Sequence, residues 1–436
     1  MSHISQRFSG KTAVIGSGIS GLGAAHALAR HTSVTLFESG SRFGGHANTV
    51  QVTLPGEAGP VSHGVDTGFL VYNERTYPRL IALFAELGVQ TAEADMSFSV
   101  RALDRDRSLE WAGSNLGTVF AQRSNVLRPK FWKMLRELLR LNALCTQLAE
   151  KQADDELRMP LSDFLLKHRF GREIQDWYLL PMLGCIWSCP TEQMLQFPTS
   201  TMIRFCHNHG LMQITGRPKW RTVAGGSKHY VDAIIAGIQD ARLNSPVQRI
   251  ERTSQGIRVS TLQGSELFNH VIIATHAPQA LSMLADASAE ERDVLGAFRT
   301  QSNLAVLHTD TSVLPVRRKV WSAWNYAADP AAGPASRVGL HYLINKLQPL
   351  PFVQPVIVSL NPARAIDAHQ VQASIEYAHP VMDIASREAQ DRLGHIQGRN
   401  NTWFCGAWTR YGFHEDGLMS GQAAARDILQ RLREAR

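Results

Sequence analysis

The fold of this chain is most constrained by one segment, KTAVIGSGISGLGAAHALARHTSVTLFESG at residues 11–40. Its apolar pattern predicts a buried strand at Thr12–Ile15, an alanine-rich helix at Ile19–Arg30 and a second strand at Ser33–Phe37. A glycine turn separates the first strand from the helix. This order of elements is typical of a Rossmann-like nucleotide-binding unit, so the sequence predicts an α/β fold with a parallel sheet.

Three glycines of the turn, Gly16, Gly18 and Gly21, have the GxGxxG spacing. Gly16 permits the tight turn, Gly18 lets the backbone approach a pyrophosphate, and Gly21 lets helix and strand pack closely. Ile19 and Ser20 begin the helix, whose free N–H groups and positive dipole end attract phosphate. The expected ligand is therefore a dinucleotide.

Glu38 follows the second strand, 22 residues after Gly16. A carboxylate at this distance accepts hydrogen bonds from the hydroxyls of the adenosine ribose. It also repels a 2′-phosphate, which argues against a phosphorylated ribose at this site.

A second glycine pair comes directly after this acid, in ESGSRFGGH at residues 38–46. A plain NAD site has no need of it. The stretch resembles the second signature of the FAD-binding amine oxidase superfamily, in which an arginine and a Gly-Gly pair approach the phosphates of FAD. The resemblance implies cofactor contacts from Ser39, Arg42, Gly44, Gly45 and His46, although the family usually has arginine at the position of His46.

Further stretches extend the resemblance along the chain. The segment 243–262 resembles the hairpin beside the adenine, 270–278 the strand that closes the nucleotide domain, and 402–429 the C-terminal flavin segment. TVAGGSKHYVDAI (222–234) is similar to the glycine pair and helix that precede the hairpin. The cofactor contacts that the resemblance implies in these stretches and near residue 66 are Thr67, Gly68, Val247, Ala274, Thr275, Gly406, Gly417, Leu418 and Met419.

Two of these stretches are expected to lie beside the flavin ring. A helix that begins near Gly417 directs its N-terminus at the N1/O2 edge of the ring, where its dipole stabilises the reduced, anionic form. In HGVDTGFLVYN (63–73), Asp66 is expected on the flavin side, with Tyr72 and Asn73 near the substrate.

The resemblance also predicts two domains. The FAD-binding domain is expected to be discontinuous and to comprise 1–90, 222–296 and 398–436. The remaining parts, 91–221 and 297–397, are expected to form an inserted substrate domain of a mixed sheet and helices, as in monoamine oxidase-like proteins. Within it, residues 96–113 predict two strands joined by a polar turn.

The candidate catalytic residues are His414, Tyr411 and Glu415 in the loop before the last helix. A histidine near the flavin acts as a general base when a carboxylate orients it. The alternative is structural, with His414 bonded to backbone and Glu415 capping the helix. Asn303 stands near the place where many amine oxidases have a lysine, which counts against a standard amine oxidase.

The expected cofactor is FAD, bound non-covalently, because GFHEDG (412–417) has no cysteine for attachment. There is no second GxGxxG, so electrons are expected to pass to oxygen or another acceptor rather than to NAD(P). The five cysteines (Cys145, Cys185, Cys189, Cys206 and Cys405) match no common zinc spacing, so no metal site is expected.

Stretches such as VDTGFLVYNERTYPRL (65–80) and SAWNY (322–326) resemble bacterial NAD/FAD-binding proteins encoded beside cyclopropane-fatty-acyl synthases. The resemblance implies an FAD-dependent oxidoreductase that oxidises or isomerises an apolar substrate, a fatty acyl chain of membrane lipid, by hydride transfer to flavin N5. Three alternatives stay open: an amine or polyamine oxidase, a carotenoid-type desaturase or isomerase, and a non-catalytic, FAD-bound partner of a cyclopropane-fatty-acyl synthase-type methyltransferase.

The chain of 436 residues has a formal net charge of +7 and no nucleic-acid-binding signature. It shows no export signal and no long apolar run, so a cytoplasmic protein is expected. The basic charge suits peripheral contact with an anionic membrane at its inner face. Helix-patterned residues 128–142 combine basic and aromatic side chains, which fits either a membrane interface or packing on a basic domain.

Overall fold

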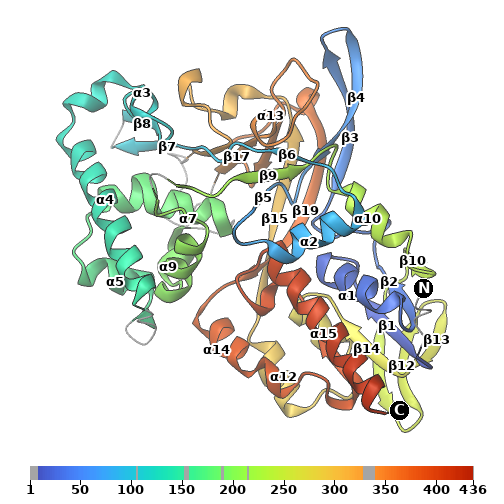
Figure 1. Ribbon diagram of the computed structural model, residues 1–436. Helices are drawn as coiled ribbons and strands as arrows, with labels where there is room; N and C mark the ends of the chain where they lie inside the picture. The colour runs from blue at the N-terminus through green and yellow to red at the C-terminus, as the bar shows by residue number, and fades with distance from the viewer. Residues whose placement is uncertain are drawn as a thin grey trace.

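The computed structural model describes residues 8–104, 107–151, 157–187, 191–213, 216–327 and 339–435; Cys189 lies outside these ranges. Figure 1 shows the first strands and the last helix at one end of the molecule and the helices α3, α4 and α5 at the other. A second, larger sheet lies between these two ends.

The first sheet has five parallel strands in the order β10-β2-β1-β14-β20. Their bounds are Asp240–Arg242, Ser33–Phe37, Lys11–Ile15, His270–Ile273 and Thr402–Phe404. Helix α1 (Ile19–Ala29) follows β1. The predicted strand, helix and strand are confirmed, although β1 begins one residue earlier and α1 ends one residue earlier than predicted.

Side chains of β1 alternate between two apolar cores, as the pleat of a strand requires. Val14 packs on one face of the sheet, whereas Ala13 and Ile15 pack on the other. The helices on the face of Val14 are α1, α2 (Pro78–Leu87), α10 (Lys228–Ile235) and α15 (His414–Glu434). On the opposite face lie α11 (Ala277–Met283), α12 (Ala289–Gly296) and α14 (Ile384–Arg392).

The same opposite face is covered by an antiparallel meander of three strands. They are β11 (Arg249–Thr253), β12 (Gly256–Thr261) and β13 (Gly264–Phe268). The strand, break and strand predicted within 243–262 are therefore present as β11 and β12.

Seven strands form the second sheet, in the order β19-β15-β18-β17-β16-β7-β8. All neighbours are antiparallel except β16 and β7. The bounds are Val371–Val381, Arg299–His308, Ile357–Leu360, Gly339–Leu343, Trp324–Ala327, Phe98–Asp104 and Arg107–Ala112. The strand pair predicted within 96–113 is confirmed as β7 and β8.

Helices from 116 to 208 pack beside this sheet and share its core. They are α3 (Leu116–Val119), α4 (Pro129–Glu150), α5 (Leu161–Lys167), α6 (Arg172–Ile174), α7 (Leu180–Trp187), α8 (Thr191–Leu195) and α9 (Thr199–Asn208). A π-helical stretch at Gln175–Leu179 joins α6 to α7. Smaller elements complete the fold: the hairpin β3 (Thr49–Gly56) and β4 (Gly59–Asp66), a sheet of β5 (Tyr72–Asn73), β9 (Trp220–Val223) and β6 (Thr91–Glu93), and α13 (Ile344–Leu347).

Two elements pack across the predicted domain boundaries. Val52, Leu54 and Val65 of the β3–β4 hairpin belong to the core of the seven-stranded sheet, and Ala389 of α14 belongs to the core of the parallel sheet. The boundaries themselves stay predictions. Within the described part of the chain, no helix combines the length and the apolarity that a bilayer span requires.

Candidate active site

The first glycine loop leaves open space at the start of α1. Gly16 has φ +97°, and its N–H donates to the carbonyl of Phe37 at 2.8 Å. A Cβ on Gly21 would overlap the carbonyl oxygen of Gly16, which explains the close packing of helix and strand. A Cβ on Gly18 would meet nothing within 4 Å. The backbone of Gly18 therefore faces a space into which a pyrophosphate fits, at the positive end of the helix.

The second glycine pair closes the same space from the other side. Gly44 N–H donates to the carbonyl of Ser17 at 3.1 Å, and a Cβ on Gly45 would lie 3.0 Å from Cα of Gly18. The Arg42 guanidinium donates to the carbonyl of Gly45 at 2.8 Å. We call the paired loops 16–21 and 42–46 the glycine cradle.

Glu38 fixes the first loop of the glycine cradle to the turn at Gly40. Its Oε2 accepts from the N–H of Ser17 at 3.0 Å and from Ser17 Oγ at 2.5 Å, and its Oε1 accepts from Gly40 N–H at 2.8 Å. Ser39, next to it, is exposed. The ribose contact expected of Glu38 stays a prediction.

The N-terminus of α15 lies against that of α1. A Cβ on Gly417 would lie 2.8 Å from Ile19 Cγ2, and one on Gly421 would overlap the carbonyl oxygen of Ser20. Only glycine permits this approach, so two positive helix ends meet beside the glycine cradle. Three more residues expected to bind the cofactor lie at or near the start of α15. Gly406 donates its N–H to Ser420 Oγ at 3.0 Å. Leu418 is buried, and Met419 is half-buried.

The predicted residues after β14 and before β11 also reach this edge. Ala274 N–H donates to the carbonyl of Ile15 at 2.7 Å, and Trp408 Nε1 donates to the carbonyl of Thr275 at 3.0 Å. Val247 lies two residues after Ser245, whose N–H donates to the carbonyl of Glu38 at 2.8 Å. These segments bring three distant parts of the sequence to the carboxyl edge of the parallel sheet.

Behind the glycine cradle lies a polar cluster that joins it to the seven-stranded sheet. The His46 ring stacks on Tyr377 with centroids 4.8 Å apart, and its Nε2 is buried without a hydrogen-bond partner. Thr67 Oγ1 lies 2.8 Å from the hydroxyl of Tyr377. A Cβ on Gly68 would overlap the carbonyl oxygen of His46. Thr67 and Gly68 are therefore placed against the second glycine loop.

His379 completes this cluster. Its ring centroid lies 5.0 Å from that of His46, and its Nδ1 lies 2.7 Å from Asn303 Nδ2. Because the amide donates, Nδ1 accepts and the proton of a neutral His379 is on Nε2. Burial lowers the pKa of His379 to about 4, and burial together with His379 holds the pKa of His46 well below its usual range. Both rings are neutral at pH 7.

Sequence reasoning missed Tyr377 and His379. They lie on β19, and only the register of β19 on β15, which pairs Tyr377 with Asn303, brings them to the glycine cradle. The one signal available was the unusual Asn303, noted where a lysine is common in amine oxidases.

His414, the predicted base, is held by two rings. It stacks on Phe69 with centroids 3.8 Å apart, and its Nε2 lies 2.7 Å from the hydroxyl of the buried Tyr230. Burial lowers the pKa of His414 to about 3, so the ring is neutral. This geometry agrees with a structural histidine, and its role as base stays a prediction.

The neighbouring carboxylates are bonded to backbone, not to His414. Glu415 Oε1 and Oε2 accept from the N–H groups of Arg79 and Leu80 at 2.9 and 3.0 Å, and so cap α2 rather than α15. Asp416 accepts from the N–H of Phe413 at 3.0 Å, and burial raises its pKa to about 7.

Asp66, expected on the flavin side, is also fully engaged. Its carboxylate accepts from Ser227 N–H at 2.9 Å, Thr49 Oγ1 at 2.5 Å and Gln348 Nε2 at 2.8 Å. It therefore fastens the turn before α10 to β4. Tyr72 packs in the core of the parallel sheet, and Asn73 Oδ1 accepts from the N–H of Thr76 at 2.9 Å.

Tyr411 belongs to an aromatic group between the last loop and the helices. Its carbonyl accepts from Trp187 Nε1 at 3.2 Å, and its ring lies 6.4 Å from that of Phe205. Phe205 stacks on Phe413 at 4.5 Å. This group covers the start of α15 with apolar surface.

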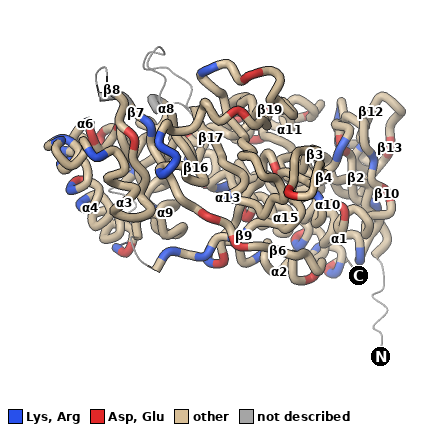
Figure 2. The backbone as a smooth tube through the Cα atoms, turned by 90° about the horizontal axis from the view of Figure 1, so that it is seen from above, with Lys and Arg blue, Asp and Glu red and all other residues tan. Residues whose placement is uncertain are grey.

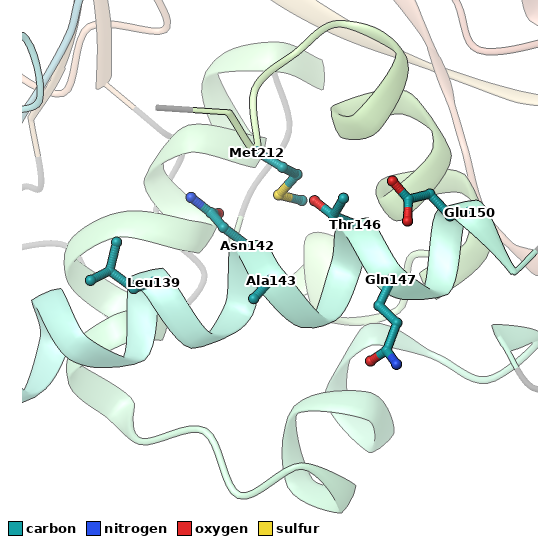
Figure 3. A pocket seen from close by; sticks show the side chains of 7 residues that line it. All are labelled: Leu139, Asn142, Ala143, Thr146, Gln147, Glu150 and Met212. Carbon is teal, nitrogen blue, oxygen red and sulfur yellow. The ribbon is translucent and has the colours of Figure 1, made fainter. Parts of the chain in front are cut away.

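A separate surface hollow of about 430 Å³ lies on α4, away from the glycine cradle. Figure 3 shows Met212 reaching over α4 beside Asn142 and Thr146. In the described ranges, no group of three His, Cys, Asp or Glu side chains is arranged to hold a metal ion, and the described cysteines are unpaired and buried.

A parallel sheet whose carboxyl edge carries two glycine loops and two helix N-termini defines a dinucleotide-binding protein. The family model for "Flavin containing amine oxidoreductase" matches residues 19–338, and the chain belongs to this family. It is an FAD-dependent enzyme. The open space at Gly18, beside the positive ends of α1 and α15, fits the pyrophosphate of this cofactor.

Solved structures share the whole fold. A CLA-producing fatty acid isomerase from P. acnes has a TM-score of 0.66 at 15% identity, over 97% of this chain and 98% of its own. Cyclohexylamine oxidase from Brevibacterium oxydans IH-35A has 0.67 at 16%, over 97% and 99%. Putrescine oxidase bound to putrescine has 0.67 at 15%, over 97% and 99%. No curated protein matches the sequence.

Proposed function

We propose that this enzyme oxidises or isomerises an apolar substrate, a fatty acyl chain of membrane lipid. The observation that carries the proposal is the state of the polar groups beside the glycine cradle. His46, His379 and His414 are neutral, and the carboxylates of Glu415 and Asp416 are bonded to backbone N–H groups. The three rings carry no charge that could attract or repel an amine, and the oxygens of the two carboxylates are occupied at the starts of α2 and α15, whereas an acyl chain suits the aromatic surface around Phe413.

The residues of the chain have separate tasks in this proposal. The glycine cradle and the N-terminus of α1 hold the pyrophosphate of FAD, and the N-terminus of α15 faces the flavin ring. FAD supplies the two-electron acceptor when bound. The aromatic group of Trp187, Phe205 and Phe413 excludes water from the acyl chain.

His46 is the group that the geometry favours for the companion proton. Its buried Nε2 has no partner, whereas Nε2 of His414 already meets the Tyr230 hydroxyl. A neutral imidazole of low pKa accepts a proton only transiently, so a proton taken from the acyl chain is passed on quickly. Isomerisation requires that both this proton and the hydride return to other carbons of the same chain. Loss of the proton to solvent gives net oxidation, with the two electrons passing to oxygen or another acceptor.

The shared fold with a fatty acid isomerase supports the acyl substrate. The same fold is found in cyclohexylamine oxidase and putrescine oxidase, so amine oxidation is the second candidate. The two candidate functions are distinguished by testing whether a lipid or an amine reduces the flavin.

The test is anaerobic. The FAD-loaded protein is mixed with unsaturated phosphatidylglycerol, then with cyclohexylamine and putrescine, while the visible flavin band is followed and the acyl chains are analysed for moved or new double bonds. Bleaching by lipid, or a moved double bond, supports the proposal. Bleaching by an amine alone overturns it. If neither reacts, and the protein binds a cyclopropane-fatty-acyl synthase-type methyltransferase, the non-catalytic alternative replaces it.

Two variants assign the proton acceptor. His46→Gln is expected to lower the rate at least about tenfold because general base catalysis contributes that much or more. His414→Gln should leave the chemical step nearly unchanged and lower thermal stability instead. The reverse pattern would return the role of base to His414.

A further inference from the structure

Helices α3 and α4 lie at one end of the molecule (Figure 1), and the 3₁₀ turn Arg123–Leu127 stands between them in the chain. Several large apolar side chains of these elements are exposed. Leu116 is 78% exposed, Leu127 85% and Leu139 53%, and half of Trp132 is exposed. We call these four residues and the basic side chains between them the α3–α4 surface.

The apolar residues of the α3–α4 surface are neighbours. Trp132 Nε1 donates to the carbonyl of Val126 at 2.9 Å, which holds the indole against the 3₁₀ turn that ends at Leu127. The Phe120 ring lies 5.2 Å from that of Trp132, and Phe120 N–H donates to the carbonyl of Leu116. Leu139 follows Trp132 by seven residues and so lies on the same face of α4.

The exposed side chains are not needed to hold α4 in place. The opposite face of the helix buries Phe131, Met134, Leu141 and Cys145 in the core. Their burial anchors α4, while about half of Trp132 and half of Leu139 stay exposed on its outer face.

The charge of this surface has one sign. Arg123, Lys130 and Arg136 are exposed on it, and Lys319 lies beside Gly117 of α3. Between residues 114 and 143 the one acidic residue is Glu137, which is buried and accepts from Gly171 N–H at 3.1 Å. Figure 2 shows several Lys and Arg positions at the end of the molecule that carries α4 and α6.

We propose that the α3–α4 surface docks on an anionic phospholipid bilayer. Leucine and tryptophan enter the boundary between headgroups and acyl chains, while arginine and lysine meet the lipid charges. Cationic side chains around an apolar patch complement such a surface better than a protein partner of mixed charge. The proposal goes beyond the proposed function, since docking does not depend on which substrate reacts.

The test is vesicle flotation of the full-length, FAD-loaded protein. Binding is expected to vesicles of phosphatidylglycerol and phosphatidylcholine, to weaken with added salt, and to be at least about tenfold weaker for pure phosphatidylcholine. Leu116→Ser/Leu127→Ser and Arg123→Glu/Arg136→Glu should each lower binding about tenfold or more. Leu262→Ser, at an exposed leucine of the β12–β13 hairpin, is the matched control and should bind as the parent does.

Unchanged binding by both double variants overturns the proposal, as does equal binding to the two kinds of vesicle. Thermal unfolding of each variant checks that the fold is kept. Activity on a short-chain acyl substrate in solution separates docking from chemistry. A variant that no longer floats with vesicles but still oxidises or isomerises this substrate has lost membrane binding and kept its active site.

Discussion

Gly18 shows how much one residue decides in the glycine cradle. Its backbone angles, φ −63° and ψ 174°, are open to any amino acid, and an added Cβ meets no protein atom within 4 Å. Gly16 differs, because its φ of +97° and the nearby carbonyl of Ala274 forbid a side chain in the folded protein itself. Gly18 is thus kept free for the ligand and not for the fold.

Gly18→Ala is expected to keep the unfolding temperature of the apoprotein and to weaken FAD binding at least about tenfold, because the methyl group occupies the approach of the pyrophosphate. Fluorescence titration with FAD and a thermal melt measure the two effects. Gly394→Ala, at another glycine with open surroundings, is the control. Normal FAD affinity in the Gly18 variant would remove the pyrophosphate from this position.

At the residue scale, Gly16 and Gly18 follow from their spacing, and Gly44 and Gly45 from the family resemblance. The structure places both pairs around one space, and their contact with the cofactor stays a prediction. The partners of His414 do not follow from spacing, since Phe69 and Tyr230 come from distant segments. The residues around Glu415 in the sequence do not indicate that its carboxylate caps α2.

At the scale of elements, the cap on α2 is a tertiary contact. Pro78 begins the helix, and the N–H groups of Arg79 and Leu80 are both bonded to Glu415. A carboxylate also favours the positive end of the helix. Glu415 therefore fixes α2 to the start of α15.

Glu415→Ala is expected to lower the free energy of unfolding by about 1–2 kcal/mol, the usual cost of losing an N-terminal cap. Glu415→Gln keeps an acceptor and should lose less. Urea unfolding measures both. A Gln variant with full stability and little activity would show instead that the carboxylate acts in catalysis.

The crossing of α1 and α15 depends on glycine in both helices. Gly421→Ala should cost about 1–3 kcal/mol, because the new methyl group overlaps the backbone of Ser20 and forces the helices apart. Ala423→Ser, on the exposed side of α15, serves as the control in the same urea experiment. Unchanged stability of the Gly421 variant would mean that the two helices separate at no cost.

Local elements were predictable, whereas their pairing was not. The apolar pattern predicted β1 and β2 to within one residue, and it placed the pair β7 and β8 within residues 96–113. The pairing of β15 with β19 brings together residues more than seventy positions apart, such as Asn303 and Tyr377. No local sequence pattern predicts which residues of two distant strands are paired. The polar cluster behind the glycine cradle could therefore not be predicted.

At the scale of the whole molecule, several histidines of the described chain are buried and neutral at pH 7. Burial lowers the pKa of His209, His308 and His379 to about 4 and that of His341 and His414 to about 3, and it holds the pKa of His46 well below its usual range. In the unfolded chain each imidazole takes a proton near pH 6.5. The unfolded state therefore binds more protons below that pH.

Stability is expected to be full above about pH 6.5 and to fall as the pH drops toward 4. Asp66 and Asp416, whose pKa values are raised to about 6 and 7, act in the opposite sense but are fewer. Thermal melts from pH 7.5 to 5 measure the slope. His379→Gln should flatten it, and His395→Gln, at an exposed histidine, should not. A flat profile for the parent would contradict the neutral state of these rings.

The order of the strands has a consequence for how the protein is made. β1 is made long before β20, which completes its sheet, and before α15, which covers it. Until β20 has been made, β14 presents an open edge that can pair with another chain. A stop codon before residue 402 would leave this edge open permanently, because it removes both the strand and the helix that close the sheet.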